Sequence, residues 1–411
     1  MKVYVFIYNV VAIKAKLSEL LNKNDSRFIL IGSDYCINNL TLENQQFFHE
    51  IHRIERNFHT PDITKIEPII NNLVAQYTAK ALVLLTNEDS TQLSCALLRE
   101  KYNIEGNTIH DLIPYVKKNV SKLKLEGIIR TPRFKLFNKE KHDQNAEVYQ
   151  AELIAEIGFP MFIKPIDLVS SIGTYLVNDE KTLSIILATI KQSAWDFEID
   201  EYIEGELFHC DFIVVNQTIK FFSACLYANP LAQFSKGKPM GSIPVNDNTL
   251  FDELYTFSFS ALKALGLFSS AFHVEVFKDK QTGALIFLEA AARTPGALVP
   301  EMYEISHGVH LEQLHFLTQI APEKVPDRQA PFLYAGWITY PKTKGIIKNI
   351  CFPKLKIHHK TITYLEKGTQ SSQANSLLDS VCSVLFWDAS HQKLTKTFER
   401  LRHSNPVILN K

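Results

Sequence analysis

The chain has 411 residues, of which 46% are hydrophobic, and its 44 Lys and Arg residues balance its 44 Asp and Glu residues. This length exceeds one ordinary domain and predicts two to four compact units with sizeable cores, which excludes global disorder. The balanced charge excludes the basic field of a nucleic-acid-binding protein. The amino-acid sequence has no apolar run long enough to span a bilayer, so no membrane partner is expected.

The six cysteines lie far apart and form neither a Cys-x-x-Cys pair nor a Cys/His cluster with zinc spacing. This pattern predicts reduced core thiols in a cytoplasmic protein. The apolar N-terminus, Val3–Ile13, is interrupted by Asn9 and no small-residue cleavage site clearly follows it. We therefore interpret it as a first β-strand and not as a signal peptide.

Short apolar runs alternate with amphipathic segments over the first 110 residues. Lys2–Val11, Phe28–Ser33 and Ala81–Thr86 are typical of buried strands in a parallel sheet, and Glu43–Arg56 is expected to be helical. This α/β alternation predicts a Rossmann-like N-terminal domain over residues 1–112. The chain has only 15 glycines and contains neither Gly-x-Gly-x-x-Gly nor a Walker P-loop, so any phosphate must be bound in another way.

A helix predicted over Pro114–Glu126 is followed by long strands with interspersed helices, a pattern that favours α+β lobes over a second doubly wound sheet. A small β-rich C-terminal part is expected over residues 326–411, opening with Ala330–Pro341 and closing with a helix near Leu394–His403. The strands expected between these parts are Met161–Lys164, Thr174–Val177, Leu207–Val215, Ile219–Leu226, Ala271–Lys278 and Ala284–Ala291, and the helices are Ala146–Ile157, Thr182–Gln192 and Phe251–Leu265.

Two carboxylates are expected to face each other on one β-hairpin. Centring its turn near residues 281–282 sets Glu275 opposite Glu289 and His273 opposite Ala291. Directly opposed Cβ atoms lie about 4.5–5.5 Å apart, and two carboxylates at such a distance repel by about 4 kcal/mol near a protein surface. A protonated carboxyl or a bound cation relieves this repulsion, and oxygen ligands on one face suit Mg²⁺.

The alternative is a solvent-facing hairpin whose polar side happens to hold two glutamates. Spacing alone favours this alternative. It is weakened by apolar residues that the alternation places on the same face as the glutamates, namely Phe277, Leu285 and Phe287.

Lys164 ends a buried strand and is followed by a loop of small residues, Ser170–Gly173. A lysine at a strand end faces the mouth of a cleft, and the N–H and hydroxyl groups of such a loop can hold phosphate. Further along, His209 and Asp211 place a polar pair on a strand face that is otherwise apolar. Taken singly, an exposed lysine before a turn and a structural histidine are the commoner explanations.

In their order along the chain, these residues resemble the ATP-grasp superfamily, and in particular its carboxylate–amine ligase branch, which includes L-amino-acid ligases. The resemblance covers nearly the whole chain. It implies that the Rossmann-like domain precedes a two-lobed ATP-grasp fold, with a small lobe over residues 113–190. The large lobe, which carries the metal hairpin, is then expected over residues 191–325.

The resemblance implies a set of ATP contacts. Lys118 falls in the place of the first nucleotide lysine, but Lys117 stands where an aspartate is usual, so Lys117, Lys118 and Lys122 all remain candidates. Lys164 is similar to the second phosphate lysine. The other implied contacts are Ser170, Ser171 and Gly173 of the phosphate loop, Asp200 with the main chain of Glu201 and Ile203 at adenine, and Glu206 or His209 at the ribose or phosphates.

The same resemblance makes Glu275 and Glu289 the ligands of Mg²⁺ (or Mn²⁺). Ala291 replaces an asparagine that is a frequent third ligand, and we hypothesise that His273 fills part of this vacancy. Arg293, four residues after Glu289, is expected to fork onto the substrate carboxylate or an acyl phosphate. His273 and Ser242 are further candidate substrate contacts, and Ser242 lies in a loop over residues 232–244.

These residues together imply an ATP-dependent ligase that joins a small-molecule carboxylate to an amine, plausibly two amino acids, through an acyl phosphate with release of ADP. Lys164 and Arg293 are the implied catalytic residues. Two alternatives remain open: a carboxylate–thiol ligase or carboxylase-type enzyme, and an ATP-binding regulatory module without turnover, which Ala291 and Lys117 keep in play. A homodimer is the default expectation for the assembly.

Overall fold

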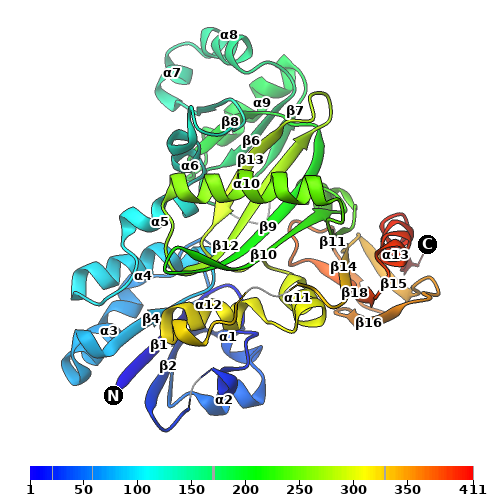
Figure 1. Ribbon diagram of the computed structural model, residues 1–411. Helices are drawn as coiled ribbons and strands as arrows, with labels where there is room; N and C mark the ends of the chain where they lie inside the picture. Colours follow the sequence, from blue (N-terminus) through cyan, green and yellow to red (C-terminus); the bar gives the residue numbers. More distant parts are fainter. Residues whose placement is uncertain (21, 58, 169–171, 328–329, 411) are drawn as a thin grey trace.

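The computed structural model describes residues 1–20, 22–57, 59–168, 172–327 and 330–410. In Figure 1 the N-terminal sheet lies at the bottom, a small lobe at the top, a large sheet between them and the C-terminal part at the right. Among the described residues, no helix combines the length and apolar character needed to cross a membrane.

The N-terminal sheet has four parallel strands in the order β3-β2-β1-β4. Successive residues of β1 pack on opposite faces, so that Phe6 joins one core and Val5 the other. Both faces are therefore buried, which is typical of a parallel sheet. Its elements are β1 (Lys2–Tyr8), β2 (Ser26–Ser33), β3 (Glu50–Ile54), β4 (Leu82–Leu85), α1 (Asp34–Asn38), α2 (Leu42–Phe47), α3 (Ile63–Tyr77) and α4 (Asp89–Tyr102).

The prediction of a helix over Glu43–Arg56 is wrong in its second half. Helix α2 ends at Phe47, and the chain then extends into β3, where Ile51 pairs with Leu30 of β2. The reason is tertiary, because the backbone of β2 offers a pairing edge that local helical periodicity does not register.

The helix predicted over Pro114–Glu126 is two helices, α5 (Ile109–Val116) and α6 (Lys118–Leu125). They are separated at Lys117, whose backbone is extended. The N–H of Lys118 donates to the carbonyl oxygen of Ile166 at 2.9 Å. The start of α6 is thereby tied to the small lobe, which aims the side chain of Lys118 at the cleft.

The small lobe is an antiparallel sheet in the order β5-β8-β6-β7 that packs on helices. The predicted boundary at residue 190 assigns β8 to the large lobe, but β8 pairs with β5 and β6. The elements are β5 (Phe134–Leu136), β6 (Met161–Pro165), β7 (Tyr175–Val177), β8 (Phe197–Glu201), α7 (Lys139–Gln144), α8 (Ala146–Glu156) and α9 (Glu180–Ile190).

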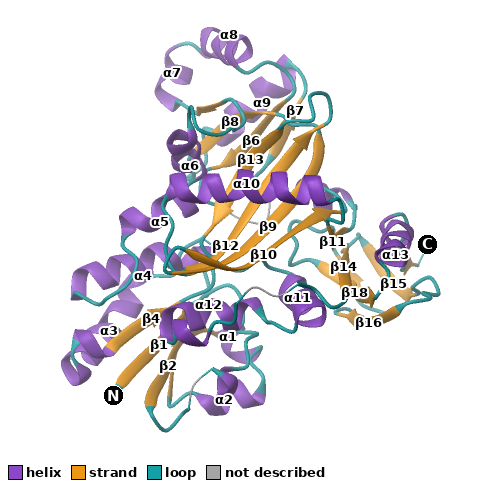
Figure 2. Ribbon diagram, in the orientation of Figure 1, coloured by secondary structure: helices purple, strands orange, loops and turns teal. Residues whose placement is uncertain are grey.

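The large sheet has eight strands in the order β13-β12-β9-β10-β11-β14-β18-β16. Figure 2 shows the long helix α10 lying across it. The strands are β9 (Gly205–Val215), β10 (Thr218–Tyr227), β11 (Met240–Pro244), β12 (Ser270–Asp279), β13 (Leu285–Ala291), β14 (Tyr334–Pro341), β16 (His358–Thr363) and β18 (Ser380–Asp388). The helices are α10 (Asn248–Leu265), α11 (Val299–His307) and α12 (Leu311–Ile320).

The two faces of β9 follow the predicted alternation. Phe208 and Phe212 belong to the core that includes Leu254 and Leu262 of α10. Ile213 belongs to the opposite core, with residues of α11 and α12. The face that carries His209 and Asp211 is thus covered by helices and sealed from solvent.

The β-rich C-terminal part continues the large sheet, because β14 pairs with β11. A second, three-stranded sheet in the order β17-β15-β19 and one helix pack beside it. These elements are β15 (Gly345–Ile350), β17 (Gln370–Ser371), β19 (Val407–Leu409) and α13 (His391–Arg402).

A buried histidine joins the N-terminal sheet to the large sheet. His315 of α12 lies 2.8 Å (Nε2) from the carbonyl oxygen of Thr86, and its Nδ1 accepts the N–H of Ala271 at 3.2 Å. An imidazole that accepts at one nitrogen and faces a carbonyl at the other is neutral. Burial lowers the pKa of His315 to about 4, which agrees with this assignment.

We expect His315 to make the protein less stable in mild acid. An unfolded histidine titrates near its ordinary pKa of 6.5 and the folded one near 4, so the unfolded state binds the proton first and stability falls as the pH decreases through this range. Thermal midpoints measured between pH 7.5 and 4.5 test this. His315→Gln, which keeps a donor and an acceptor but does not titrate, should lose less stability over the range, and equal pH slopes would contradict the expectation.

Candidate active site

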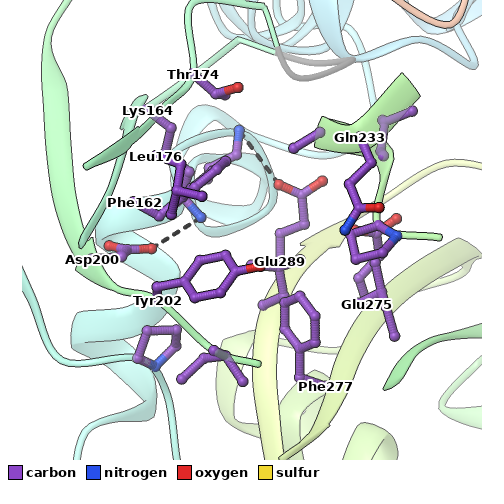
Figure 3. A pocket seen from close by; sticks show the side chains of 18 of the residues that line it. Phe162, Lys164, Thr174, Leu176, Asp200, Tyr202, Gln233, Glu275, Phe277 and Glu289 are labelled. Carbon is purple, nitrogen blue, oxygen red and sulfur yellow. Dashed lines mark ion pairs between the residues drawn. The ribbon is translucent and has the colours of Figure 1, made fainter. Parts of the chain in front are cut away.

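A cavity of about 380 Å³ lies between the small lobe and the large sheet. Figure 3 shows Phe162, Leu176 and Tyr202 close to the polar side chains at its centre. The remaining walls combine apolar and charged residues. The described residues that line it are Lys118, Pro132, Phe162, Lys164, Pro165, Leu168, Ile172, Thr174, Leu176, Asp200, Glu201, Tyr202, Ile203, Leu207, Pro230, Leu231, Ala232, Gln233, Lys236, Lys238, Glu275, Phe277, Leu288 and Glu289.

The hairpin β12–β13 forms the floor of this cavity, and its predicted register is confirmed. Glu275 pairs with Glu289, and His273 pairs with Ala291. Both glutamates line the cavity. The alternative of a solvent-facing hairpin is therefore wrong, since Glu275 is only 8% exposed.

A β-bulge after this pair changes which apolar residues accompany the glutamates. Val276 pairs with Phe287, so Leu288 is the extra residue on β13. Leu288 lies in the cavity wall, whereas Phe287 is fully buried in the opposite core with Val276. The prediction that Phe287 and Leu285 share the face of the glutamates is wrong, because strict alternation does not allow for a bulge. Phe277 does line the cavity.

Two lysines face Glu289 from the opposite side. Lys118 Nζ lies 3.6 Å from Glu289 Oε2 and donates to the carbonyl oxygen of Leu168 at 2.6 Å. Lys164, at the end of β6, lies 3.1 Å from Asp200 Oδ2 (Figure 3). Burial raises the pKa of Glu289, but Lys118 and then Lys164 lower it, and the net shift is downward. The carboxylate is thus held ionised by Lys118 of α6 and Lys164 of the small lobe.

Lys122 is buried behind the cavity. Its Nζ donates to Asp200 at 2.6 Å and to Glu198 at 2.9 Å, and its side chain has no solvent exposure. Among the three candidate lysines, Lys118 lies in the cavity wall. Lys122 lies behind the wall, where it binds Glu198 and Asp200. Glu198 was not anticipated from the sequence, although period two places it on the same face of β8 as Asp200.

Asp200 faces these lysines with both carboxylate oxygens, and its predicted ATP contact stays a prediction. Burial lowers the pKa of Lys164 but the carboxylates of Asp200 and Glu198 raise it, and the net shift is upward. A lysine whose positive charge is secured in this way suits an anionic ligand in the cavity.

The segment that joins the lobes lines the cavity with Glu201, Tyr202 and Ile203. The N–H of Glu201 donates to the carbonyl oxygen of Arg133 at 2.9 Å, and its carboxylate accepts from Arg130 and Arg133. The main-chain contacts of Glu201 and Ile203 with adenine stay a prediction.

Three predicted contacts lie outside the cavity wall. Glu206 is exposed on β9, and its neighbour Leu207 lines the cavity instead. His209 is fully buried, bonded to Asp211 at 2.7 Å and to Ser242 at 2.9 Å. Strand alternation turns Glu206 away from the side of Leu207, whereas burial separates His209 and Ser242 from the cavity. The predicted ATP contacts of Glu206 and His209 and the substrate contact of Ser242 stay predictions that this geometry does not support.

The predicted phosphate loop falls partly outside the described residues, since Ser170 and Ser171 belong to the segment 169–171. Gly173 is described and has a φ of +69°. A Cβ atom there would lie 3.2 Å from Pro165 Cγ and 3.3 Å from the Trp195 ring. Left-handed backbone and this close approach both favour glycine at the end of the loop.

Arg293 follows the hairpin and connects it to the N-terminal domain. Its Nε donates to Asp89 Oδ2 at 2.6 Å, and its Nη1 donates to the carbonyl oxygen of Thr294 at 2.8 Å. Burial lowers the pKa of Arg293 but Asp89 raises it, and the net shift is upward. Asp89 opens α4 directly after β4, so the carboxyl end of the parallel sheet reaches the hairpin.

Glu275 and Glu289 suit a divalent cation that prefers oxygen ligands. They are opposed carboxylates in one cavity wall, and Glu275 Oε1 accepts from the Tyr227 hydroxyl at 3.1 Å. Ala291 offers no donor. His273 Nε2 lies 3.5 Å from Glu275 Oε1 and its Nδ1 lies 2.7 Å from Asp211 Oδ1. Its role as a third ligand or substrate contact stays a prediction.

We expect Lys122→Met to destabilise the fold, because it leaves Glu198 and Asp200 buried with only Lys164 to compensate them. Removing one partner from a buried ion pair typically costs about 3–5 kcal/mol. Urea-induced unfolding at pH 7 measures the loss. Adding Glu198→Gln should recover part of it, whereas Lys139→Met on the surface should change little. A loss below about 1 kcal/mol for Lys122→Met would contradict this account.

Comparison with known proteins places this geometry in context. The family model of the D-Ala–D-Ala ligase C-terminus matches residues 123–228. An L-arginine-specific L-amino acid ligase of Bacillus subtilis is 23% identical over 237 residues, which is 56% of this chain and 55% of that protein. A D-alanine–D-alanine ligase of Chlorobium chlorochromatii (strain CaD3) is 26% identical over 174 residues, or 39% and 47% of the two chains. The chain thus spans about half the length of these curated relatives.

The crystal structure of an L-amino acid ligase from Bacillus licheniformis superposes with a TM-score of 0.73 at 14% identity and covers 100% of this chain and 99% of that one. This likeness extends over the N-terminal sheet, both lobes and the C-terminal part. Together with the family match over residues 123–228, it agrees with the resemblance inferred from the sequence and shows that the chain has the fold of this L-amino acid ligase.

Proposed function

We propose that this protein is an ATP-dependent ligase that forms a C–N bond between a carboxylate and an amine and releases ADP and phosphate. One observation carries the proposal. Glu275 and Glu289, opposed carboxylates on the hairpin, line the same cavity as Lys118 of α6 and Lys164 of the small lobe. Such an arrangement of acids and bases suits a polyphosphate with its divalent cation.

The nucleotide is assigned along the cavity. The adenine would lie at the segment Glu201–Ile203, between apolar side chains such as Phe162 and Leu288. The triphosphate would then reach Lys118 and Lys164. Glu275 and Glu289 would hold Mg²⁺ or Mn²⁺, which when bound would neutralise phosphate charge and orient the terminal phosphoryl group.

The reaction we assign has two balanced steps. A substrate carboxylate oxygen attacks the terminal phosphorus, and the bond to ADP breaks. The amine nitrogen then attacks the acyl carbon, inorganic phosphate leaves, and the nitrogen gives up a proton. Lys118 and Lys164 offset the phosphate charge, and transfer of this kind depends on positioning and electrostatic stabilisation. The loop that ends at Gly173 would keep water from the acyl phosphate.

Arg293 is assigned to the substrate carboxylate or the acyl phosphate. Its contacts with Asp89 and Thr294 use Nε and Nη1, and we assign Nη2 to the ligand. A guanidinium fixed on two sides presents its remaining N–H groups in a defined direction. The mouth of the cavity, where Gln233, Lys236 and Lys238 lie, is the candidate region for the amino-acid substrates.

We further propose a cytoplasmic location and a homodimer as working assumptions. All six cysteines are free and five of them are buried, which suits a reducing compartment. The dimer rests only on the general frequency of such assemblies.

The assay measures release of ADP and phosphate with a panel of amino acids, alone and in pairs, with and without Mg²⁺. We expect ADP release that depends on Mg²⁺ and on an amino-acid pair, and a product whose mass is the sum of both amino acids less one water. Measurable ATP binding without ADP release in any mixture would instead favour a non-catalytic module, which Ala291 keeps possible.

Glu289→Gln should lower the rate of ADP release by at least about 100-fold, since even the outer partners of metal ligands are worth 10–100-fold. Loss of Arg293 should likewise abolish turnover. Glu204→Gln is a matched control, because Glu204 is an exposed carboxylate that pairs with Lys280 near the same hairpin. A Glu289→Gln variant that turns over at the wild-type rate would remove Glu289 from the mechanism.

A further inference from the structure

A buried chain of hydrogen bonds starts in the C-terminal part of the molecule. Trp337 of β14 donates its indole N–H to Ser242 Oγ of β11 at 2.8 Å. His209 Nε2 lies 2.9 Å from the same oxygen, and its Nδ1 lies 2.7 Å from Asp211 Oδ2. All four residues are at most 1% exposed. The chain thus links β14, β11 and β9 of the large sheet through buried side chains.

The chain continues from Asp211 to the hairpin. His273 Nδ1 lies 2.7 Å from Asp211 Oδ1, and His273 Nε2 lies 3.5 Å from Glu275 Oε1. Tyr303 of α11 also donates its hydroxyl to Asp211 Oδ2 at 2.7 Å. Asp211 therefore connects all of these residues. Its Oδ1 contacts His273, and its Oδ2 contacts His209 and Tyr303.

His209, Asp211 and His273 lie close enough to be considered as cation ligands. Their contacts favour a hydrogen-bond network instead. Each Nδ1 faces its own oxygen of Asp211 at 2.7 Å, which is a hydrogen-bond length. His209 also uses Nε2 on Ser242. With these atoms already engaged, the group acts as a rigid polar support.

We propose that Asp211 is a positioning residue that holds Glu275 in its cation-binding orientation through His273, and that Trp337 extends this support into the C-terminal part. The proposal rests on the proposed function, because it assumes that Glu275 binds a divalent cation.

The physical need for the support comes from the hairpin. Glu275 stands opposite Glu289, and their mutual repulsion turns the side chains apart unless other contacts restrain them. His273 and Tyr227 both approach Glu275 Oε1, at 3.5 and 3.1 Å. His273 can point its Nε2 at this oxygen only while Asp211 fixes the other side of the ring. Partners that orient a metal ligand in this way typically affect metal affinity by 10–100-fold.

The test is binding of Mn²⁺ to the full-length protein in the presence of ADP, measured from the electron paramagnetic resonance signal of free Mn²⁺. Asp211→Asn keeps the size of the side chain but replaces one acceptor oxygen by an amide. We expect its Mn²⁺ dissociation constant to rise about tenfold or more. ADP affinity without metal should stay within about twofold of wild type, because the nucleotide walls are untouched and a purely structural defect would weaken both.

Two further variants keep the test decisive. Trp337→Phe keeps an aromatic ring but loses the indole donor, and should raise the Mn²⁺ dissociation constant by less than Asp211→Asn does. Ser383→Ala removes a buried hydrogen bond of 2.7 Å to Thr339 in the same sheet, away from the network. It should leave the Mn²⁺ dissociation constant unchanged despite a comparable loss of stability.

The outcomes separate this inference from the proposed function. If the wild type binds Mn²⁺ with ADP and both Asp211→Asn and Trp337→Phe bind it equally well, the positioning role is wrong and the proposed function stands. If Trp337→Phe alone matches the wild type, the support does not extend to the C-terminal part. If the wild type itself binds no Mn²⁺, the metal-dependent function fails and the positioning role fails with it.

Discussion

The cleft depends on how its buried charges compensate each other across two lobes. Glu275 and Glu289 stand opposite each other on the cavity floor. Their repulsion destabilises the folded protein, because the dielectric constant there is lower than in water. Lys118 of α6 pairs with Glu289, Lys164 of the small lobe acts on it electrostatically, and a lysine buried without partners would itself lose its charge. The charge of Glu289 is thus compensated by lysines outside its own hairpin, and the same lysines suit a polyphosphate.

The basic side of the cleft needs its own support. Lys164 stays charged because Asp200 and Glu198 lie against it, and these carboxylates are in turn compensated by Lys122 from α6. A buried ion cluster of this kind gains little net stability, but breaking it is costly, because the remaining charge has no water to replace its partner. Lys118 begins the same helix, so α6 positions both Lys118 and Lys122 relative to β8.

Much of the site was accessible from the sequence because its strands obey period two. The opposition of Glu275 and Glu289 and the polar face of β9 follow from counting residues from a recognisable turn. The bulge at Leu288 was not predictable, because nothing in the local residues marks the extra position, and it moved Phe287 to the opposite core. Period-two alternation along β9 does agree with the structure in placing Leu207, and not Glu206, on the cavity side.

Other differences have tertiary causes. Residues 50–54 have a helical pattern but form β3, since β2 offers a parallel partner that only the folded chain supplies. His209 was expected at a nucleotide because its position resembles that of an ATP contact in the ATP-grasp superfamily. Only the three-dimensional arrangement shows that Asp211 and Ser242, from the same and another strand, satisfy both of its ring nitrogens.

The buried polar network also constrains the register of the large sheet. Ser242 pairs directly with Trp337 where β11 meets β14, and the indole N–H reaches the serine hydroxyl across that pair. A slip of one residue would turn Trp337 to the other face and leave the hydroxyl with one partner fewer in a region without solvent. Apolar packing alone tolerates such slips more readily than a chain of directional bonds does. The polar chain therefore specifies how the C-terminal strands join the sheet, and it ends at His273, whose Nε2 lies 3.5 Å from Glu275 Oε1 in the cleft wall.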